Sequence, residues 1–298
     1  MFVRIFNENI PMNMQYSLQD LKEISSKGDF IFATIQGYKN NNFLFDLGNG
    51  INGLMPFNEY DLKGLKYKYA KSFVGKHIVA TIVSIEDSGE VFLSRVNMQK
   101  KYKEDVLDKL KPCTLIETKV LSLSSFGAFV DLGIGFVGLL PICDISIARF
   151  QYIQDVLSVG QEIKVLYKNK TDKGYVVTHK ELLGTWEENV KNFKKGFSYV
   201  GKVIDKTDYG LFIELKPNLT GLSDFIANED FEVGDSVSYI YKSNNAESLK
   251  VKVQVVGKAK EDYKIFYDYV DFDENTITWF YTPDKSKKKI FTDFGVDN

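Results

Sequence analysis

The chain has 298 residues, of which 44% are hydrophobic and 26% are charged, a balance that is typical of a folded globular protein and excludes a disordered tail. Lysine and arginine together number 38 against 40 aspartates and glutamates, so the formal net charge is −2. This charge excludes a histone-like protein that holds nucleic acid through bulk charge, but it leaves open a surface that is locally basic or aromatic.

Targeting and membrane signals are not expected. No stretch approaches the roughly 18 uninterrupted apolar residues that a membrane helix needs. The first 14 residues contain no apolar run before a small-residue cleavage site, so we expect no signal peptide. Cys113 and Cys143 are the only cysteines and form no CxxC pair, which favours a reducing compartment, the cytoplasm, over a disulfide scaffold.

The N-terminal leader, residues 1–27, is expected to end in a short helix. Ser17 and Asp20 have the spacing of a capping box, and they open the amphipathic segment YSLQDLKEISSKG. This helix leads into the first of three similar segments.

An internal repeat dominates the rest of the chain. Residues 41–56, NNFLFDLGNGINGLMP, align without a gap to residues 126–141, FGAFVDLGIGFVGLLP, and to residues 209–224, YGLFIELKPNLTGLSD. Each copy holds an acid, a glycine and a leucine at matched positions. The acids, which we expect to face outward as solubility or orientation residues, are Asp46, Asp131 and Glu214.

The pattern within a copy has a period of two, as in a half-buried strand. In the second copy Ala128 and Val130 point one way while Phe129 and Asp131 point the other. About five such strands recur per copy, and five strands that close on themselves to hide the sheet edges describe an OB-fold barrel. The sequence therefore predicts an all-β chain of three tandem five-stranded OB-fold barrels, over residues 28–98, 112–183 and 196–257.

Helices are expected to join the barrels. The segments VNMQKKYKEDVLDKL and KELLGTWEENVKNFKKG predict helical linkers over residues 99–111 and 184–195. The C-terminal extension, residues 258–298, alternates again in KIFYDYV, TITWFYT and KKIFTDF, with PDKSK as a turn, so we expect a small β-rich extension.

The second copy brings a family resemblance. The stretch KVLSLSSFGAFVDLGIGFVGLLPICDIS, followed by VGQEIKVL, resembles the S-one (S1) domain, the RNA-binding domain named after small-subunit ribosomal protein S1. The segments GLMPFNEY, THKELLGTWEENV and WFYTPDKSKK make most of the chain similar to the short S1 homologues of clostridia. The resemblance implies single-stranded RNA binding in translation, on a surface of two aromatic residues, a basic group and often a histidine.

The resemblance places the aromatic pair on Phe126 and Phe129 in the second copy and on Tyr209 and Phe212 in the third. The period of two independently places Phe129 and Phe212 on the outside of their barrels. The alternative is that each ring packs beneath a linker helix or a neighbouring barrel. We favour base stacking, because matched exposed rings in two repeats are less common than isolated ones.

Other positions depart from the family pattern. Asn41 and Leu44 replace the aromatic pair in the first copy, so we assign the first barrel to protein docking or spacing. The family's histidine position holds Pro56, Pro141 and Asp224. Its arginine position holds, by a looser alignment, Glu90, Gly174 and Lys250. Only the third copy therefore keeps an aromatic pair together with a cation.

Lysines near the expected faces are candidates for phosphate contacts. They are Lys119, Lys202, Lys242 and Lys250. Denser runs occur in DLKGLKYKYAK, QKKYK and DKSKKK, and the first two interleave Tyr67, Tyr69 and Tyr102 with lysines. Such interleaving suits RNA contact, although a solvated loop or helix face explains each run taken alone.

Catalytic, cofactor and metal sites are not expected. The GxGxxG strings at residues 48–53 and 133–138 open no helix, so they indicate turns rather than a dinucleotide site. His77, His179 and the two cysteines lack ligand spacing. No catalytic domain is left over outside the three barrels, which disfavours an RNA-processing enzyme.

These features predict a non-enzymatic, cytoplasmic protein, expected to be a monomer, that binds single-stranded RNA. The RNA is expected to be mRNA, held on the second and third barrels, with the small ribosomal subunit as a further partner. The alternative is a protein-interaction scaffold whose outward aromatic residues are covered by a partner or by one another. The slightly acidic balance and the missing histidine and arginine favour this alternative.

Overall fold

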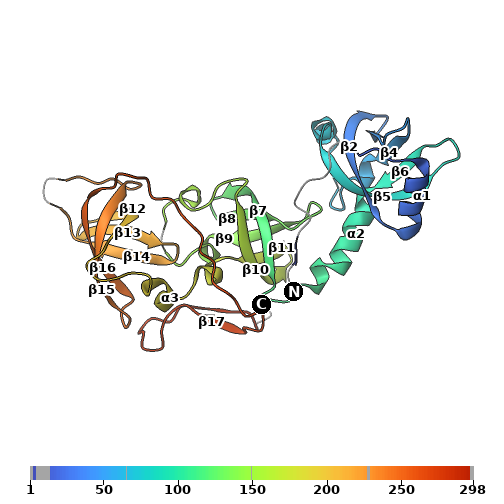
Figure 1. Ribbon diagram of the computed structural model, residues 1–298. Coiled ribbons are helices and arrows are strands. Elements are labelled where there is room, and N and C mark those ends of the chain that lie inside the picture. The colour runs from blue at the N-terminus through green and yellow to red at the C-terminus, as the bar shows by residue number, and fades with distance from the viewer. Residues whose placement is uncertain (1–2, 5–13, 65, 149, 227–228, 296–298) are drawn as a thin grey trace. The chain divides into compact units, whose positions relative to one another are not determined.

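A computed structural model describes residues 3–4, 14–64, 66–148, 150–226 and 229–295 of the chain. Three barrels follow one another along the sequence (Figure 1). Residues 1–2 and 5–13 of the expected leader, and with them the prediction that no signal peptide is present, lie outside the described residues. Within the described ranges, no helix is long and apolar enough to cross a membrane.

All three barrels have the same strand order, in which the first strand pairs with the second and the fourth, and the third pairs in parallel with the fifth. The first barrel consists of β2 (Phe30–Lys39), β3 (Asn42–Asp46), β4 (Asn52–Pro56), β5 (His77–Ile85) and β6 (Val91–Ser94). The second consists of β7 (Leu115–Ser124), β8 (Gly127–Asp131), β9 (Val137–Pro141), β10 (Glu162–Thr171) and β11 (Gly174–Thr178). The third consists of β12 (Ser198–Thr207), β13 (Gly210–Lys216), β14 (Leu219–Ser223), β15 (Ser236–Asn245) and β16 (Lys250–Lys258).

The prediction of an all-β chain with three tandem five-stranded barrels is confirmed. The second barrel additionally carries β1 (Val3–Arg4), which pairs in parallel with β7. Burial alternates along the strands, so that inward side chains such as Ile35, Val130 and Ile213 are fully buried while their neighbours remain partly exposed. The alternation that the sequence shows is therefore the alternation that closes each barrel.

The turn between the second and third strands uses the same backbone conformation in each barrel. Gly50, Gly135 and Asn218 stand at matched positions with φ of 75°, 85° and 68°. These are left-handed values, which glycine adopts freely and asparagine tolerates best among residues with a side chain. The GxGxxG strings are therefore turns, as expected, and the third barrel replaces the glycine by a residue with a polar side chain.

The helices confirm some expectations and correct one. Helix α1 (Leu18–Lys27) begins at the expected capping box, with Ser17 as its N-cap, and α2 (Arg95–Asp105) with the 3-10 turn η3 (Leu107–Lys109) follows the first barrel. The second junction does not form one continuous helix. It consists of the 3-10 turn η6 (Lys180–Leu183) and the five-residue α3 (Trp186–Val190), because Gly184 between them has a φ of 81°. The remaining 3-10 turns are η1 (Phe57–Glu59), η2 (Tyr67–Phe73), η4 (Ile142–Asp144) and η5 (Ile153–Asp155).

The C-terminal extension forms fewer strands than its sequence pattern suggests. Its last two alternating segments pair as β17 (Thr278–Phe280) and β18 (Phe291–Asp293), the small hairpin that was expected. The first segment, residues 264–270, forms no strand. We call residues 259–295 the strap, because this stretch runs back from the third barrel to the second (Figure 1). Its alternating aromatic residues pack onto the barrels instead of pairing with a neighbouring strand.

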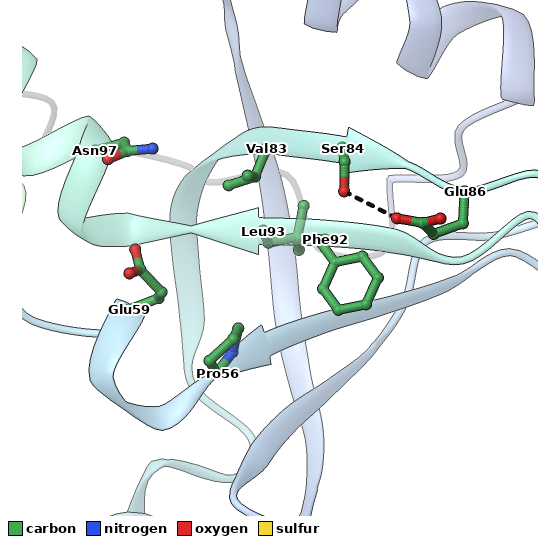
Figure 2. Close-up of a pocket in the computed structure, with 8 residues that line it drawn as sticks. All are labelled: Pro56, Glu59, Val83, Ser84, Glu86, Phe92, Leu93 and Asn97. Atoms are coloured by element: carbon green, nitrogen blue, oxygen red, sulfur yellow. Dashed lines mark hydrogen bonds between the residues drawn. The ribbon is translucent and has the colours of Figure 1, made fainter.

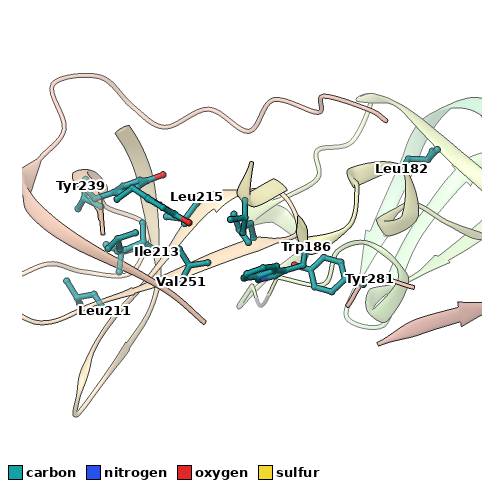
Figure 3. Packing of buried hydrophobic residues seen from close by; sticks show 14 of the residues in the cluster. Leu182, Trp186, Leu211, Ile213, Leu215, Tyr239, Val251 and Tyr281 are labelled. Carbon is teal, nitrogen blue, oxygen red and sulfur yellow. The ribbon is translucent and has the colours of Figure 1, made fainter. Parts of the chain in front are cut away.

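The chain divides into two compact units, and only one of them contains the strap. One unit holds the first barrel with α1 and α2, and the other holds the second and third barrels with α3 and the strap. In the second unit a single hydrophobic core includes the inside of the third barrel, Leu166 and Leu182 at the second barrel, and Trp279 and Tyr281 of the strap. Trp186 of α3 lies beside Tyr281 in this core, and its backbone N–H donates to the Tyr281 carbonyl at 3.0 Å (Figure 3).

Asn218 joins the second and third barrels. Its Oδ1 accepts from the backbone N–H of Ile147 at 2.8 Å, and its Nδ2 donates to the carbonyl of Lys180 at 2.6 Å. The Tyr281 hydroxyl of the strap donates to the Asn218 carbonyl. Because Asn218 is 1% exposed, each of these bonds satisfies a group that has lost its contact with water.

The strap covers a buried histidine at the edge of the second barrel. His179 has no exposed surface, and its two ring nitrogens lie 3.0 Å from the Ile145 carbonyl and 3.2 Å from the Tyr269 hydroxyl. Tyr267 and Tyr269 stack on each other, and both contact the histidine ring edge-on. Burial lowers the pKa of His179 to about 4, so this residue packs as a neutral ring.

One of the repeated acids does not face outward as expected. Asp46 is exposed, but Glu214 is 4% exposed and lines small cavities between the second barrel, the third barrel and the strap. Burial raises the pKa of Glu214 to about 7, against an opposing effect of Lys202. The second barrel and the strap, which lie outside the repeat pattern of the third barrel, together convert this outer position into a buried one.

Replacing Asn218 by glycine tests the junction of the two barrels. Asn218→Gly keeps the left-handed turn, as at Gly50 and Gly135, but removes the amide and leaves the Ile147 N–H and the Lys180 carbonyl unpaired. We expect the free energy of unfolding to fall by about 2–4 kcal/mol, measured by denaturant titration of the whole chain. Asn40→Gly is the control, because Asn40 is exposed and also left-handed with a φ of 48°. An equal small effect in both variants would contradict the role assigned to Asn218.

Replacing Glu214 by glutamine tests the buried carboxyl. The pKa of Glu214 is about 7 in the folded chain, against 4.5 in the unfolded chain. Folding therefore carries the full cost of burying the charged carboxylate above pH 7 and none of this cost below pH 4.5. Glu214→Gln should therefore be more stable than the unmodified chain at pH 8, by up to about 3 kcal/mol, and lose that gain near pH 4.5. The lowered pKa of His179 makes the stability depend on pH in the opposite direction, but this contribution is the same in both chains and cancels when they are compared. Asp46→Asn, at the matched exposed position of the first repeat, is the control for the loss of one negative charge. A gain in stability of Glu214→Gln that is the same at pH 4.5 and pH 8 would contradict the raised pKa of Glu214.

Candidate nucleic-acid interface

The second and third barrels each present a pair of aromatic rings in the same arrangement. The ring centroids of Phe126 and Phe129 are 5.8 Å apart at an interplanar angle of 88°, and those of Tyr209 and Phe212 are 6.1 Å apart at 83°. Phe126 is 55% exposed and Tyr209 is 64% exposed, while their partners are partly exposed. In both barrels an open ring is thus held edge-to-face by a second ring, the packing that aromatic pairs prefer.

A glycine directly after the open ring fixes this geometry. A Cβ atom at Gly127 would lie 2.4 Å from the Leu140 carbonyl oxygen, and a Cβ atom at Gly210 would lie 2.3 Å from the Ser223 carbonyl oxygen. No residue with a side chain fits there without a shift of the backbone. The close approach of the second and third strands therefore requires a glycine directly after the open ring.

The second ring of each pair belongs to a row of outward side chains that crosses three strands. In the second barrel the row is Phe129, Leu139 and Val176, on β8, β9 and β11. In the third barrel it is Phe212, Leu222 and Lys252, on β13, β14 and β16. In the first barrel it is Leu44, Leu54 and Phe92. The backbone therefore forms an equivalent outer surface in each of the three barrels, and the barrels differ in the side chains on that surface.

Lys252 is the cation that completes the third row, and the sequence comparison missed it. The looser alignment chose Lys250, which lies two residues earlier on the same outer face of β16. The pairing of β15 with β16 contains register shifts, which displace the two strands of this hairpin relative to each other. Lys242 lies at one of these shifts, between Tyr241 and Ser243. The alternating string KVKVQVV marks Lys252 as outward, but only the register places it beside the ring pair.

Two of the expected lysines are not brought to the ring pairs. Lys119 on β7 lies 3.7 Å from a carboxylate oxygen of Glu162, its partner on β10. Lys202 on β12 is opposite Glu214 in the register, lies 3.9 Å from Asp155, and its side chain is only 22% exposed. Both lysines lie on the first strand of their barrel and face carboxylates, whereas Lys252 belongs to the row itself.

An aspartate lies close to Lys252. It competes with phosphate for the ammonium group but leaves the lysine side chain exposed. The Lys252 ammonium group lies 3.3 Å from Asp224, and both side chains are largely exposed, at 63% and 77%. An ion pair this exposed contributes little free energy and exchanges readily with a phosphate. Asp224 stands where the S1 resemblance implies a histidine, and its ion pair with Lys252 leaves both side chains exposed.

The described residues hold no group of three or more histidine, cysteine, aspartate or glutamate side chains that could bind a metal ion. Cys113 is buried, and burial raises the pKa of its thiol to about 12, so it is not an activated nucleophile. Its thiol donates to the Thr276 carbonyl of the strap at 3.1 Å.

Comparisons with known proteins relate the chain to S1-type proteins. Residues 109–179, the second barrel, match the family described as the S1 RNA binding domain. Over 295 residues the chain is 27% identical to the small ribosomal subunit protein bS1 of Rickettsia conorii, and the alignment covers 93% of this chain and 50% of that protein. It is 30% identical over 210 residues to the bS1 protein of Rickettsia typhi, covering 68% of this chain and 36% of that protein.

One similarity lies outside ribosomal proteins. The chain is 32% identical over 164 residues to 4-hydroxy-3-methylbut-2-enyl diphosphate reductase of Clostridium acetobutylicum, covering 51% of this chain and 25% of that enzyme. The chain thus spans half or less of each of these relatives. The second barrel is an S1 RNA binding domain, and the resemblance of the chain to tandem S1-type proteins, expected from its three repeats, is confirmed.

Proposed function

We propose that this chain binds single-stranded RNA by stacking bases on the open rings of its second and third barrels. The observation that carries the proposal is the recurrence of one edge-to-face ring pair, with one ring open, at matched positions of two barrels. The S1 RNA binding domain match of the second barrel supports it. The bS1 relatives support a setting in the cytoplasm at the small ribosomal subunit, with mRNA as the ligand.

The chemistry follows from the side chains present. A base can lie flat on Phe126 or Tyr209 while the edge-to-face partner keeps that ring from rotating away. Stacking of one base contributes about 1–3 kcal/mol and reads no sequence, since every base has an aromatic face. In the third barrel Lys252 supplies a cation for the phosphate beside the stacked base, with Lys250 and Lys242 further along the same hairpin.

The arrangement of two barrels in one unit favours tandem binding. Asn218, α3 and the strap join the second and third barrels, so a strand bound to one barrel stays close to the other. Two weak sites that are linked bind one strand more tightly than either site alone. The proposed molecule is a monomer without catalytic activity, and the match to the reductase is confined to a quarter of that enzyme.

A protein-interaction scaffold is the second candidate. The row Phe129, Leu139 and Val176 of the second barrel is apolar throughout and holds no cation, which suits a protein partner as well as a base. RNA binding accounts better for the third barrel, where the same row ends in Lys252.

Removing the rings separates the two functions. We expect Phe129→Ala and Phe212→Ala each to raise the dissociation constant for a fluorescent single-stranded RNA about tenfold, because each loses the ring that holds the stacking surface. Fluorescence anisotropy measures the affinity, and thermal melting checks that folding is intact. Phe266→Ala is the control, since Phe266 is a strap phenylalanine that is 76% exposed. RNA affinity that is unchanged in both ring variants, or absent in the unmodified chain at low salt, would favour the scaffold.

Salt dependence tests the cation. Lys252→Gln should reduce the slope of log affinity against log salt concentration by about 0.7, the value for one phosphate contact on a single strand. Lys258→Gln is a matched control on the same strand, because its side chain is also 63% exposed and is also paired with an aspartate. Equal slopes in the unmodified chain and in Lys252→Gln would remove Lys252 from the proposed surface.

A further inference from the structure

The first barrel lacks the ring pair, but a tyrosine from another loop occupies the corner where the open ring would lie. Tyr67 belongs to η2, in the connection between the third and fourth strands. Its ring lies parallel to that of Phe57, with centroids 4.3 Å apart at an angle of 17°. Tyr67 is nevertheless 62% exposed, so one face covers Phe57 and the other is open.

Backbone bonds show that this is the corner used by the other barrels. The N–H of Phe57 donates to the carbonyl of Asn41 at 2.9 Å, and the N–H of Ile142 donates to the carbonyl of Phe126 at 2.9 Å. Asn41 and Phe126 are the matched positions of the open ring. Ile142 is 38% exposed, whereas Phe57 is 3% exposed, because Tyr67 lies on top of it.

The residue that replaces the open ring orients the tyrosine. The Asn41 Nδ2 donates to the Tyr67 hydroxyl at 3.3 Å, and the Tyr38 hydroxyl donates to the Asn41 Oδ1 at 2.9 Å. A ring that is stacked on one side and held by a hydrogen bond at its edge has lost much of its rotational freedom. Such preorganisation lowers the entropy cost of binding a flat ligand on the open side.

The surroundings of Tyr67 are cationic. The lysines of this loop are all exposed, and they are Lys63, Lys66, Lys68 and Lys71. The Lys68 ammonium lies 4.9 Å from the ring centroid of Tyr69, a second tyrosine that is 49% exposed. Of the two acids that precede the loop, Asp61 lies 3.6 Å from Arg95, and Glu59 accepts a hydrogen bond from Ser94 and lines a separate pocket on the same barrel. Open aromatic faces among lysines that form no ion pair within the described part of the chain suit a base and its phosphates.

A pocket on the same barrel is a weaker candidate. It has a volume of about 400 Å³ and is lined by Pro56, Phe92 and Val83, with the carboxylates of Glu59 and Glu86 at its rim (Figure 2). Two carboxylates repel phosphate, so the charge around this pocket opposes RNA. The charge around Tyr67 has the opposite sign.

We infer that the first barrel carries a third nucleobase-stacking site, whose platform is Tyr67 stacked on Phe57 and whose phosphate contacts are the lysines of the same loop. This inference rests on the proposed function, because it adds a site for the same ligand. It replaces the assignment of the first barrel to docking or spacing.

The test uses the whole chain and a fluorescent oligouridylate of about 30 nucleotides, long enough for three barrels at about ten nucleotides each. Tyr67→Leu removes the aromatic face but still covers Phe57, which Tyr67→Ala would expose as a substitute platform. Tyr67→Phe keeps the face and is the matched control. Both substitutions are made in the unmodified chain and in the chain that carries Phe129→Ala and Phe212→Ala, where the remaining affinity reports the first barrel. Thermal melting checks the fold of each variant.

We expect Tyr67→Leu to raise the dissociation constant about tenfold in both backgrounds, and Tyr67→Phe to leave it within about twofold. If Tyr67→Leu has no effect while the ring variants of the other barrels weaken binding, the third site is overturned, the proposed function stands, and the first barrel returns to protein docking. If only Tyr67→Leu weakens binding, the third site stands and the sites on the other barrels fall. If the unmodified chain binds no RNA at low salt, both are overturned.

Discussion

The edge-to-face contact between an open ring and a half-buried ring is the interaction on which the proposed RNA-binding surface depends. It exists because, in the second and third barrels, an aromatic residue directly precedes the glycine that opens the second strand, and the third strand approaches that glycine too closely for any side chain. The outward row of the barrel then places the second ring beneath the first. A single aromatic side chain on a barrel would be free to rotate, whereas this pair presents one fixed face.

The strap and Asn218 have a different task, which is to join two such barrels into one unit. The turn that is glycine in the first two repeats is asparagine in the third, and its amide reaches across to the second barrel. The strap then covers His179 and Glu214, which would otherwise lie at the surface of their barrels. The free energy of this junction comes from buried hydrogen bonds and one continuous apolar core, so the relation between the two ring pairs is set by packing.

The barrels could be predicted from the sequence because their local pattern recurs three times, whereas the ring pairs, present in two copies, were placed by the family resemblance. The period of two fixes which side chains face outward, and the repeat fixes which of them correspond. Lys252 could not be placed in the same way, since shifts in the strand register decide whether it or Lys250 lies beside the row. Glu214 was predicted to face outward because a single barrel would expose it, and it is buried by the neighbouring second barrel together with the strap, which has no counterpart in the repeat. Tyr67 carries a weak sequence signal, a run of alternating lysine and tyrosine, but its position over Phe57 depends on how a loop folds back.

The claim that bases rest on the rings of the second and third barrels is tested most directly by photo-crosslinking. Unmodified chain is bound to RNA that contains 4-thiouridine, irradiated and digested, and mass spectrometry then locates the crosslinked residues. The account predicts crosslinks in the peptides that contain Phe126 and Phe129 and in those that contain Tyr209 and Phe212. Crosslinks confined to the strap or to lysine-rich segments away from these rings would contradict it.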